Sequence, residues 1–235
     1  MTDQFVSTWR RGRLARLLGR PGELEIVPLA DALAALGTAR GHVVTSEYKV
    51  PVDDIVGTVA RAGDFDRLFR PRSRALRERW EAVAATDLEL PPVRLIRVGE
   101  MYFAEDGHHR VSIARARGQA TIAASVRWLC TVAHAPRCLT LADLPVKAAE
   151  RAFLERVPLP DPLRFGLWLD CRSSWSRLAE SAEAWGFRHG ILDRDRLAAR
   201  WWAEEVVPVL RASKVPPEPA SIGWYFTELL AREGR

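Results

Sequence analysis

The chain has 235 residues, and 35 lysines and arginines against 30 aspartates and glutamates give a formal net charge of +5. A hydrophobic content of 48% is enough for a buried core, and the length suits one or two domains. The three scattered cysteines, Cys130, Cys138 and Cys171, exclude a disulfide framework and a cysteine-based zinc site. No apolar run reaches the roughly 18 residues that a membrane span needs, and the N-terminal stretch has no hydrophobic signal segment. We therefore expect a cytoplasmic protein that does not engage a membrane.

Two helices are predicted at the start of the chain. Apolar residues at helical spacing, with arginines between them, predict a basic amphipathic helix over 5–19 that ends at Gly19. A second, shorter helix is predicted over 29–37. A basic amphipathic helix can lie on DNA or on a membrane. We expect this one to dock on its own domain.

Three further elements are expected before residue 90. β-Branched and aromatic residues predict a strand over 41–52. Residues 53–70 are expected to be helical, with breaks at Gly57 and Gly63. A charged helix is predicted over 73–86.

Residues 93–129 show two changes of periodicity. Two short strands, 93–98 and 101–104, are expected to form a hairpin because a glycine-containing pair of residues joins them. A sharp turn then leads into a helix over 108–118, and the pattern returns to a strand over 120–129. The order indicates a mixed α/β unit with a polar cluster where a strand passes into a helix.

The remainder of the chain, 139–235, is predicted to be helical. Prolines separate its helical stretches, and residues 215–219 read as a stiff, extended linker. Tryptophans are frequent between residues 168 and 202, and we expect them to fill a helical core; they are Trp168, Trp175, Trp185, Trp201 and Trp202.

The polar cluster at 106–110 is the strongest candidate site. A helix N-terminus favours an anion, and Arg110 can add a bidentate contact to a phosphate. Gly107 allows a tight turn and a close approach of the backbone to a ligand. Asp106 can cap the helix, hold a histidine in one tautomer or ligate Mg²⁺. Because His108 and His109 are adjacent on a helix, they point about 100° apart. The structural alternative is a capped helix with one buried histidine and a salt bridge at Arg110.

The segment over 102–126, YFAEDGHHRVSIARARGQATIAASV, resembles the core motif of the ParB/sulfiredoxin superfamily. In that motif a strand runs into a turn that ends in arginine and then into a helix. The resemblance extends over about residues 45–128, and the narrower likeness is to a bacterial group of ParB-like proteins that share the DGHHR segment.

The resemblance implies a nucleotide site at the helix N-terminus. Partition proteins of the superfamily bind CTP with Mg²⁺ at this turn, its free-serine kinases bind ADP, and sulfiredoxins use ATP. Carried over, His108, His109 and Arg110 would contact phosphates, and Asp106 would orient them or hold Mg²⁺. The chain has histidine where sulfiredoxins have their cysteine nucleophile, and no helix-turn-helix is evident after residue 128.

Secondary candidates lie upstream. The glycine-punctuated segment that contains Gly57, Arg61 and Asp64 matches the same ParB-like group and could line the pocket; the alternative is a helix broken by two turns and capped by Asp64. In kinases of this fold an early carboxylate acts as base, which makes Asp53 or Asp54 a candidate.

Together these patterns predict an α+β fold with a small ParB/sulfiredoxin-like mixed sheet. The expected division is N-terminal helices over 1–40, the α/β domain over 41–138 and a helical region over 139–235. The expected function is binding of a nucleotide (CTP, ATP or ADP) with Mg²⁺, with phosphotransfer or nucleotide hydrolysis as candidate reactions and Asp106, His108 and His109 as candidate catalytic residues. The alternative is a DNA-associated regulator without turnover. The helical region is a candidate surface for a protein partner or for self-association.

Overall fold

The computed structural model describes residues 4–19, 24–39, 45–86 and 90–233. The chain divides into two compact units. The first consists of Met1–Ala34, Thr38–Thr131 and Ala135–Leu144, and the second of Ala35–Gly37, Val132–His134 and Pro145–Arg235.

The first unit is built on a mixed sheet. Its described strands are β1 (Val27–Pro28), β2 (Thr45–Pro51), β3 (Ile55–Thr58), β4 (Val93–Val98), β5 (Met101–Asp106) and β6 (Thr121–Leu129), in the spatial order β1-β3-β5-β4-β6-β2. β4 is antiparallel to β5 and β2 is antiparallel to β6. The other neighbours, β1 with β3, β3 with β5 and β4 with β6, are parallel.

The hairpin between β4 and β5 supports the centre of this sheet. Gly99 turns the chain with a φ of +57°, a conformation that glycine adopts without steric cost. β5 lies between β3 and β4, and its residues Met101–Ala104 are all buried. A strand covered on both faces favours such a continuous apolar run over strict alternation.

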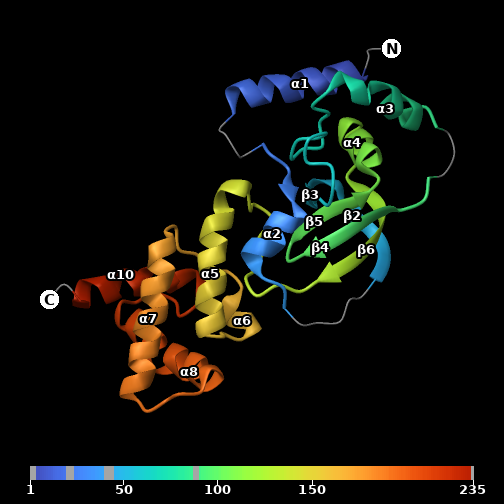
Figure 1. Cartoon of the computed structure of the whole chain (residues 1–235). Helices are drawn as coiled ribbons and strands as arrows, with labels where there is room; N and C mark the ends of the chain where they lie inside the picture. Colours follow the sequence, from blue (N-terminus) through green and yellow to red (C-terminus); the bar gives the residue numbers. More distant parts are fainter. Residues whose placement is uncertain (1–3, 20–23, 40–44, 87–89, 234–235) are drawn as a thin grey trace. The chain divides into compact units, whose positions relative to one another are not determined.

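Helices cover one face of this sheet. α4 (His108–Ala116) follows β5 directly, and α3 (Arg77–Ala84) packs against it. α1 (Gln4–Leu18) lies beside α3, as Figure 1 shows. Phe5 and Trp80 meet edge to face at 5.8 Å between ring centroids. The indole N–H of Trp80 donates to Ser112 Oγ at 2.9 Å, so that the buried ring is also satisfied as a donor.

The second unit is helical. Its elements are α5 (Leu144–Arg156), α6 (Asp161–Arg164), α7 (Arg172–Arg188), α8 (Arg194–Trp201), a π-helical turn (Trp202–Val206), α9 (Val207–Ala212) and α10 (Ile222–Glu233). The last two residues of α2 (Leu29–Leu36) belong to this unit, together with Gly37. Aromatic rings from α5, α7, α8 and α10 form the core, and two of the pairs are Phe153–Trp175 at 5.5 Å and Trp201–Tyr225 at 5.6 Å.

The tryptophan prediction is confirmed for four of the five side chains: Trp175, Trp185, Trp201 and Trp202 are buried. Trp168 is partly exposed, and its ring lies 5.4 Å from the ammonium group of Lys147. Lys147 is itself buried and forms an ion pair with Glu150 at 2.6 Å. Burial raises the pKa of the Glu150 carboxyl to about 7 against the opposing effect of Lys147.

The predicted mixed sheet, flanking helices and helical C-terminal half are confirmed. The expected helix over 53–70 is wrong, because Ile55–Thr58 forms β3 and pairs in parallel with β5. The paired β1 was not expected either. The predicted strand over 41–52 is β2, and its residues 41–44 lie outside the described residues. Within the described ranges, no helix combines the length and apolarity that a membrane crossing requires.

Candidate functional site

The turn between β5 and α4 places the 106–110 cluster at the edge of the sheet. β3 and β5 run in parallel with Thr58 opposite Ala104, so their carboxyl ends meet at the same edge. Ligands of open sheets with parallel strands commonly bind outside these ends. The loop that follows β3 therefore lies next to the start of α4.

Gly107 makes this turn possible. It is the N-cap residue of α4 and has a φ of +90°, in the left-handed region that favours glycine. A Cβ atom there would lie 2.5 Å from Val93 Cγ1 and 3.0 Å from Arg110 Nη2. Both the backbone conformation and the lack of space therefore require glycine.

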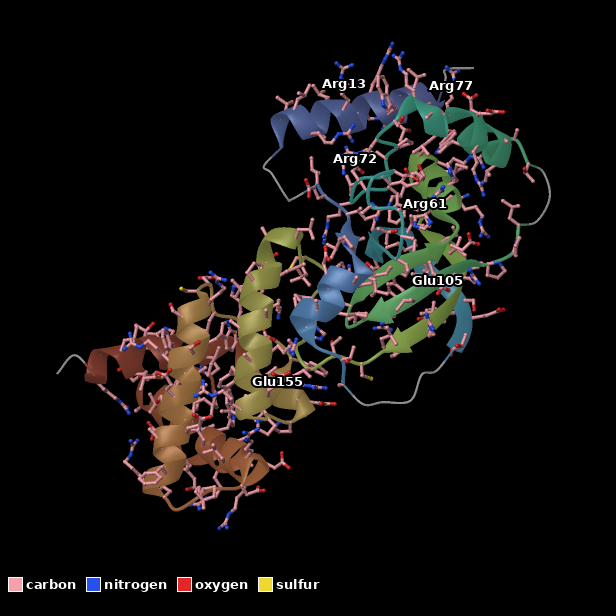
Figure 2. All side chains as sticks on the ribbon, in the orientation of Figure 1. Arg13, Arg61, Arg72, Arg77, Glu105 and Glu155 are labelled. Atoms are coloured by element: carbon pink, nitrogen blue, oxygen red, sulfur yellow. The ribbon has the colours of Figure 1, made fainter. Side chains whose placement is uncertain are left out.

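The N-terminus of α4 opens into a cavity of about 470 Å³. The lining residues from the turn are Glu105–Arg110, and the opposite walls come from Ala60, Arg61, Arg79, Val83, Leu90 and Pro91. Gly107 provides no side-chain cap, and within the described residues the backbone N–H groups of residues 108–110 have no acceptor. Free N–H groups and the positive end of a helix dipole favour an anion. Arg61 stands beside α4 in Figure 2.

His108 joins the two strand ends. Its Nε2 lies 2.8 Å from Thr58 Oγ1, which also accepts hydrogen bonds from the backbone N–H groups of Ala60 and Arg61. A hydroxyl that accepts two hydrogen bonds donates its own proton to the third partner, so the network assigns neutral His108 with its proton on Nδ1. Burial, reinforced by the positive charge of Arg61, lowers the pKa of His108 to about 4. His108 therefore positions the loop after β3, and its Nε2 is occupied.

His109 points differently and leaves one nitrogen unsatisfied. Its Nε2 faces Arg61 Nη1 at 3.4 Å; since a guanidinium only donates, Nε2 accepts and the ring proton is on Nδ1. This Nδ1 is buried and has no hydrogen-bond partner within the described residues. Burial, with contributions from Arg61 and Arg79, lowers the pKa of His109 to about 4. His109 is thus a neutral donor without an acceptor.

Arg110 and Asp106 form an ion pair. Arg110 Nη2 donates to Asp106 Oδ2 at 3.0 Å, and its Nη1 donates to the carbonyl oxygen of Pro91. The guanidinium is therefore engaged with the turn and with the segment before β4. Asp106 is the last residue of β5, not the helix cap, and its side chain is 57% exposed.

Of the secondary candidates, Arg61 lines the cavity at the start of α4, whereas Gly57 and Asp64 do not. Arg61 lines the cavity and forms an ion pair with Asp64 at 3.2 Å, so Asp64 orients it from outside the lining. Gly57 is a packing position in β3: a Cβ there would lie 2.2 Å from the Phe103 ring. Asp64 caps no helix, because the expected helix is absent from the described residues around it.

The early carboxylates are also engaged elsewhere. Asp53 lies 3.7 Å from Arg115, and Asp54 lies 3.0 Å from Arg137. Neither lines the cavity at the start of α4. The geometry does not support either as a base at this site.

Three contributors were missed from the sequence. Thr58, Arg79 and Pro91 come from separate segments, and only the fold brings them to the turn. The one local signal was for Thr58, a hydroxyl residue that follows the apolar pair Ile55–Val56 after Gly57. Within the described residues, no group of three or more histidine, cysteine, aspartate or glutamate side chains is arranged to hold a metal ion.

We expect Gly107→Ala to lower the free energy of unfolding of the first unit by about 2–4 kcal/mol, because it adds the strain of a positive φ to a clash with Val93. Urea denaturation measures this. Gly118→Ala, where φ is +67° but the space is open, isolates the cost of the backbone conformation at about 1 kcal/mol. Gly63→Ala, in open space, should change little. Equal effects at all three positions would contradict this account of the turn.

The lowered pKa of His108 predicts a pH dependence. The folded state favours the neutral ring of His108, and this preference contributes to the free energy of unfolding. The contribution is fully present above the pKa of the unfolded chain, 6.5, and is lost as pH falls toward the folded pKa of about 4. Between pH 7 and pH 4.5 the loss amounts to about 2–3 kcal/mol. His108→Gln keeps an acceptor for Thr58 but does not titrate. Urea unfolding of this variant should show a shallower fall across the same range; parallel curves would refute the assignment.

Comparisons with known proteins return no match for this chain. No protein-family model matches it. Neither a curated protein nor a solved structure matches it significantly. The function must therefore be argued from the site.

Proposed function

We propose that the protein binds the phosphate groups of a nucleotide in the cavity at the N-terminus of α4. The observation that carries the proposal is the set of donors without acceptors at this point: the first N–H groups of α4 and the buried Nδ1 of His109. A buried donor without a partner costs about 1–3 kcal/mol, and a phosphate oxygen removes that cost.

The charges around the cavity favour an anion. Both acidic groups in the lining are neutralised by arginines: Asp106 by Arg110, and Glu105 by Arg127 at 3.2 Å. Arg79 is exposed and has no ion-pair partner within the described residues. Among the described residues, Arg61 has Asp64 as its one ion-pair partner. A phosphate would supply the negative charge that Arg79 lacks and would give Arg61 a second anionic partner.

The size and surroundings suit a nucleotide. A volume of about 470 Å³ falls within the range of small-molecule sites. A second hollow of about 340 Å³ adjoins it, because both are lined by Val83, Leu90, Pro91 and Arg110. The second hollow also has the apolar side chains of Ile113 and Ile122. It offers an apolar surface for a base next to a polar site for phosphates.

Asp106 fits the role of a partial Mg²⁺ ligand. Its Oδ1 has no hydrogen-bond partner within the described residues, while Oδ2 is held by Arg110. Mg²⁺ in nucleotide sites commonly takes one or two carboxylates together with phosphate oxygens and water. One available carboxylate oxygen is therefore consistent with Mg²⁺ that arrives with the nucleotide, where it would neutralise phosphate charge.

Phosphotransfer and nucleotide hydrolysis need mainly positioning and charge stabilisation. Arg61 and Arg79 would stabilise the phosphates, and His109 would donate from Nδ1. His108 is a positioning residue in this scheme, because its Nε2 already accepts from Thr58. Arg110 acts in the same indirect way through Asp106 and Pro91.

Isothermal titration with CTP, ATP and ADP, with and without Mg²⁺, tests the proposal. We expect Arg61→Gln and Arg79→Gln each to weaken binding about 10- to 100-fold, the effect of losing one charged hydrogen bond. Arg77→Gln is the matched control, since Arg77 is on α3 but is paired with Glu81 outside the cavity. Asp106→Asn should reduce the contribution of Mg²⁺. Absence of binding to all three nucleotides, or equal weakening by the control, would refute the proposal.

DNA association is the second candidate function, and one observation favours it. Arg13 on α1 and Arg74 before α3 both lie on the Trp9 ring, at 5.9 Å and 4.5 Å from its centroid. Arg13 points away from the sheet in Figure 2. The two helices thus present positive charge on adjoining surfaces.

Neutralised phosphates release counterions, so DNA affinity by this surface should fall steeply with salt. We expect the double substitution Arg13→Gln/Arg74→Gln to reduce the slope of log K against log salt by about 2. Fluorescence anisotropy with duplex DNA measures this slope. A slope that the substitutions leave unchanged would exclude this surface.

A further inference from the structure

A third cavity in the first unit lies along the C-terminal half of α4. It has a volume of about 420 Å³ and shares no lining residue with the cavity at the start of the helix. Its walls are α1, the segment around Arg70, the C-terminal half of α4 and residues 118–120. Its lining shares Gln119 with the hollow of about 340 Å³ assigned to the base, and it shares none of the residues proposed to bind the phosphates or Mg²⁺.

Close packing of α1 forms one wall. Gly12 of α1 is buried, and a Cβ there would lie 3.1 Å from Arg70 Cβ and 3.5 Å from Asp66 Oδ2. The helix therefore approaches the 66–70 segment more closely than a larger residue would allow. This approach brings Thr8 and Arg11 to the cavity from the same helix.

The cavity carries more positive than negative charge. Arg11, Arg70 and Arg115 line it, with Asp53 as the acidic group of the lining. Asp53 is highly exposed and lies 3.7 Å from Arg115. Asp66 contacts Arg70, and both of its carboxylate oxygens already accept hydrogen bonds. Its Oδ1 accepts from two backbone N–H groups, and its Oδ2 accepts from Arg70 Nε at 2.8 Å.

Three lining residues have a buried polar atom without a hydrogen-bond partner among the described residues. They are Arg70 Nη2, Arg115 Nε and Thr8 Oγ1. Thr8 is almost wholly buried, at 5% exposure. Arg115 Nη2 donates to the carbonyl oxygens of Val52 and Ile55. These bonds fix the guanidinium in place, and its Nε is still available as a donor. Leaving several buried donors unpaired is costly, and charged ones most of all.

From this grouping we infer that the cavity between α1 and the C-terminal half of α4 is a second binding site, for the oxyanion group of a small organic molecule. Two guanidinium groups and one hydroxyl would donate hydrogen bonds to the carboxylate or phosphate oxygens. Arg11 would add charge at the rim. The apolar part of the ligand would lie on Leu68, Ala116 and Ala120. The site differs from the proposed nucleotide site in both place and composition.

Thr8→Val is the sharpest test, because it keeps the shape and removes only the hydroxyl. In the free protein the hydroxyl has no partner in the part of the chain that the structure describes, so the midpoint of thermal unfolding should be unchanged or higher. Affinity for the anion should fall about tenfold, which corresponds to about 1.4 kcal/mol. Arg11→Gln should weaken binding severalfold. Arg13→Gln removes the same charge from the same helix but lies outside the lining, and it should leave affinity unchanged.

Inorganic phosphate and succinate are the two probes, titrated calorimetrically into the full chain. Binding of succinate but not of phosphate identifies a carboxylate site. If phosphate binds, titration of the Arg61→Gln variant beside the wild type shows which of the two cavities holds it. Binding that survives Arg61→Gln and weakens in Thr8→Val supports the inference. Binding that is lost in Arg61→Gln and kept in Thr8→Val belongs to the other cavity and overturns it. The inference is also overturned if neither probe binds, or if Arg13→Gln weakens binding as much as Arg11→Gln.

Discussion

The left-handed turn at Gly107 is the constraint on which the candidate site depends. It ends β5, begins α4 without a side-chain cap and leaves no space for a Cβ beside Val93. A residue with a side chain would have to move either Val93 in the sheet or the Arg110 guanidinium. The same turn therefore exposes the helix N-terminus and holds the Asp106–Arg110 pair in place.

Two adjacent histidines perform different tasks because a helix separates their directions. His108 accepts a hydrogen bond from the Thr58 hydroxyl and stacks near Phe65 and Phe69, which fixes the end of β3 against α4. His109 meets Phe65 edge to face, and its Nδ1 has no hydrogen-bond partner among the residues that the structure describes. Burial lowers the pKa of both imidazoles, so the positive charge at the cavity comes from arginines and from the helix dipole.

Arginine serves two purposes in the first unit. Some guanidinium groups are structural: Arg67 donates to the carbonyl oxygens of Leu139 and Arg137, and Arg110 joins the turn to Pro91. Others have donors or charge beside a cavity that no other described residue satisfies, as Arg79 does at one end of α4 and Arg70 at the other. Only the second kind can recognise a ligand without breaking a bond that the fold needs.

Local patterns in the sequence determined the β4–β5 hairpin, the turn, α4 and β6, because each is specified by periodicity and by glycine within a few residues. They also located the polar cluster at 106–110. They did not determine β1 or β3, since such short strands exist only through parallel pairing with partners distant in the chain. Nor could they show that His108 and Arg110 are already engaged, or that Thr58 and Arg79 belong to the site. Only the tertiary structure decided these points, because a side chain's free hydrogen-bonding capacity depends on partners that long-range contacts bring to it.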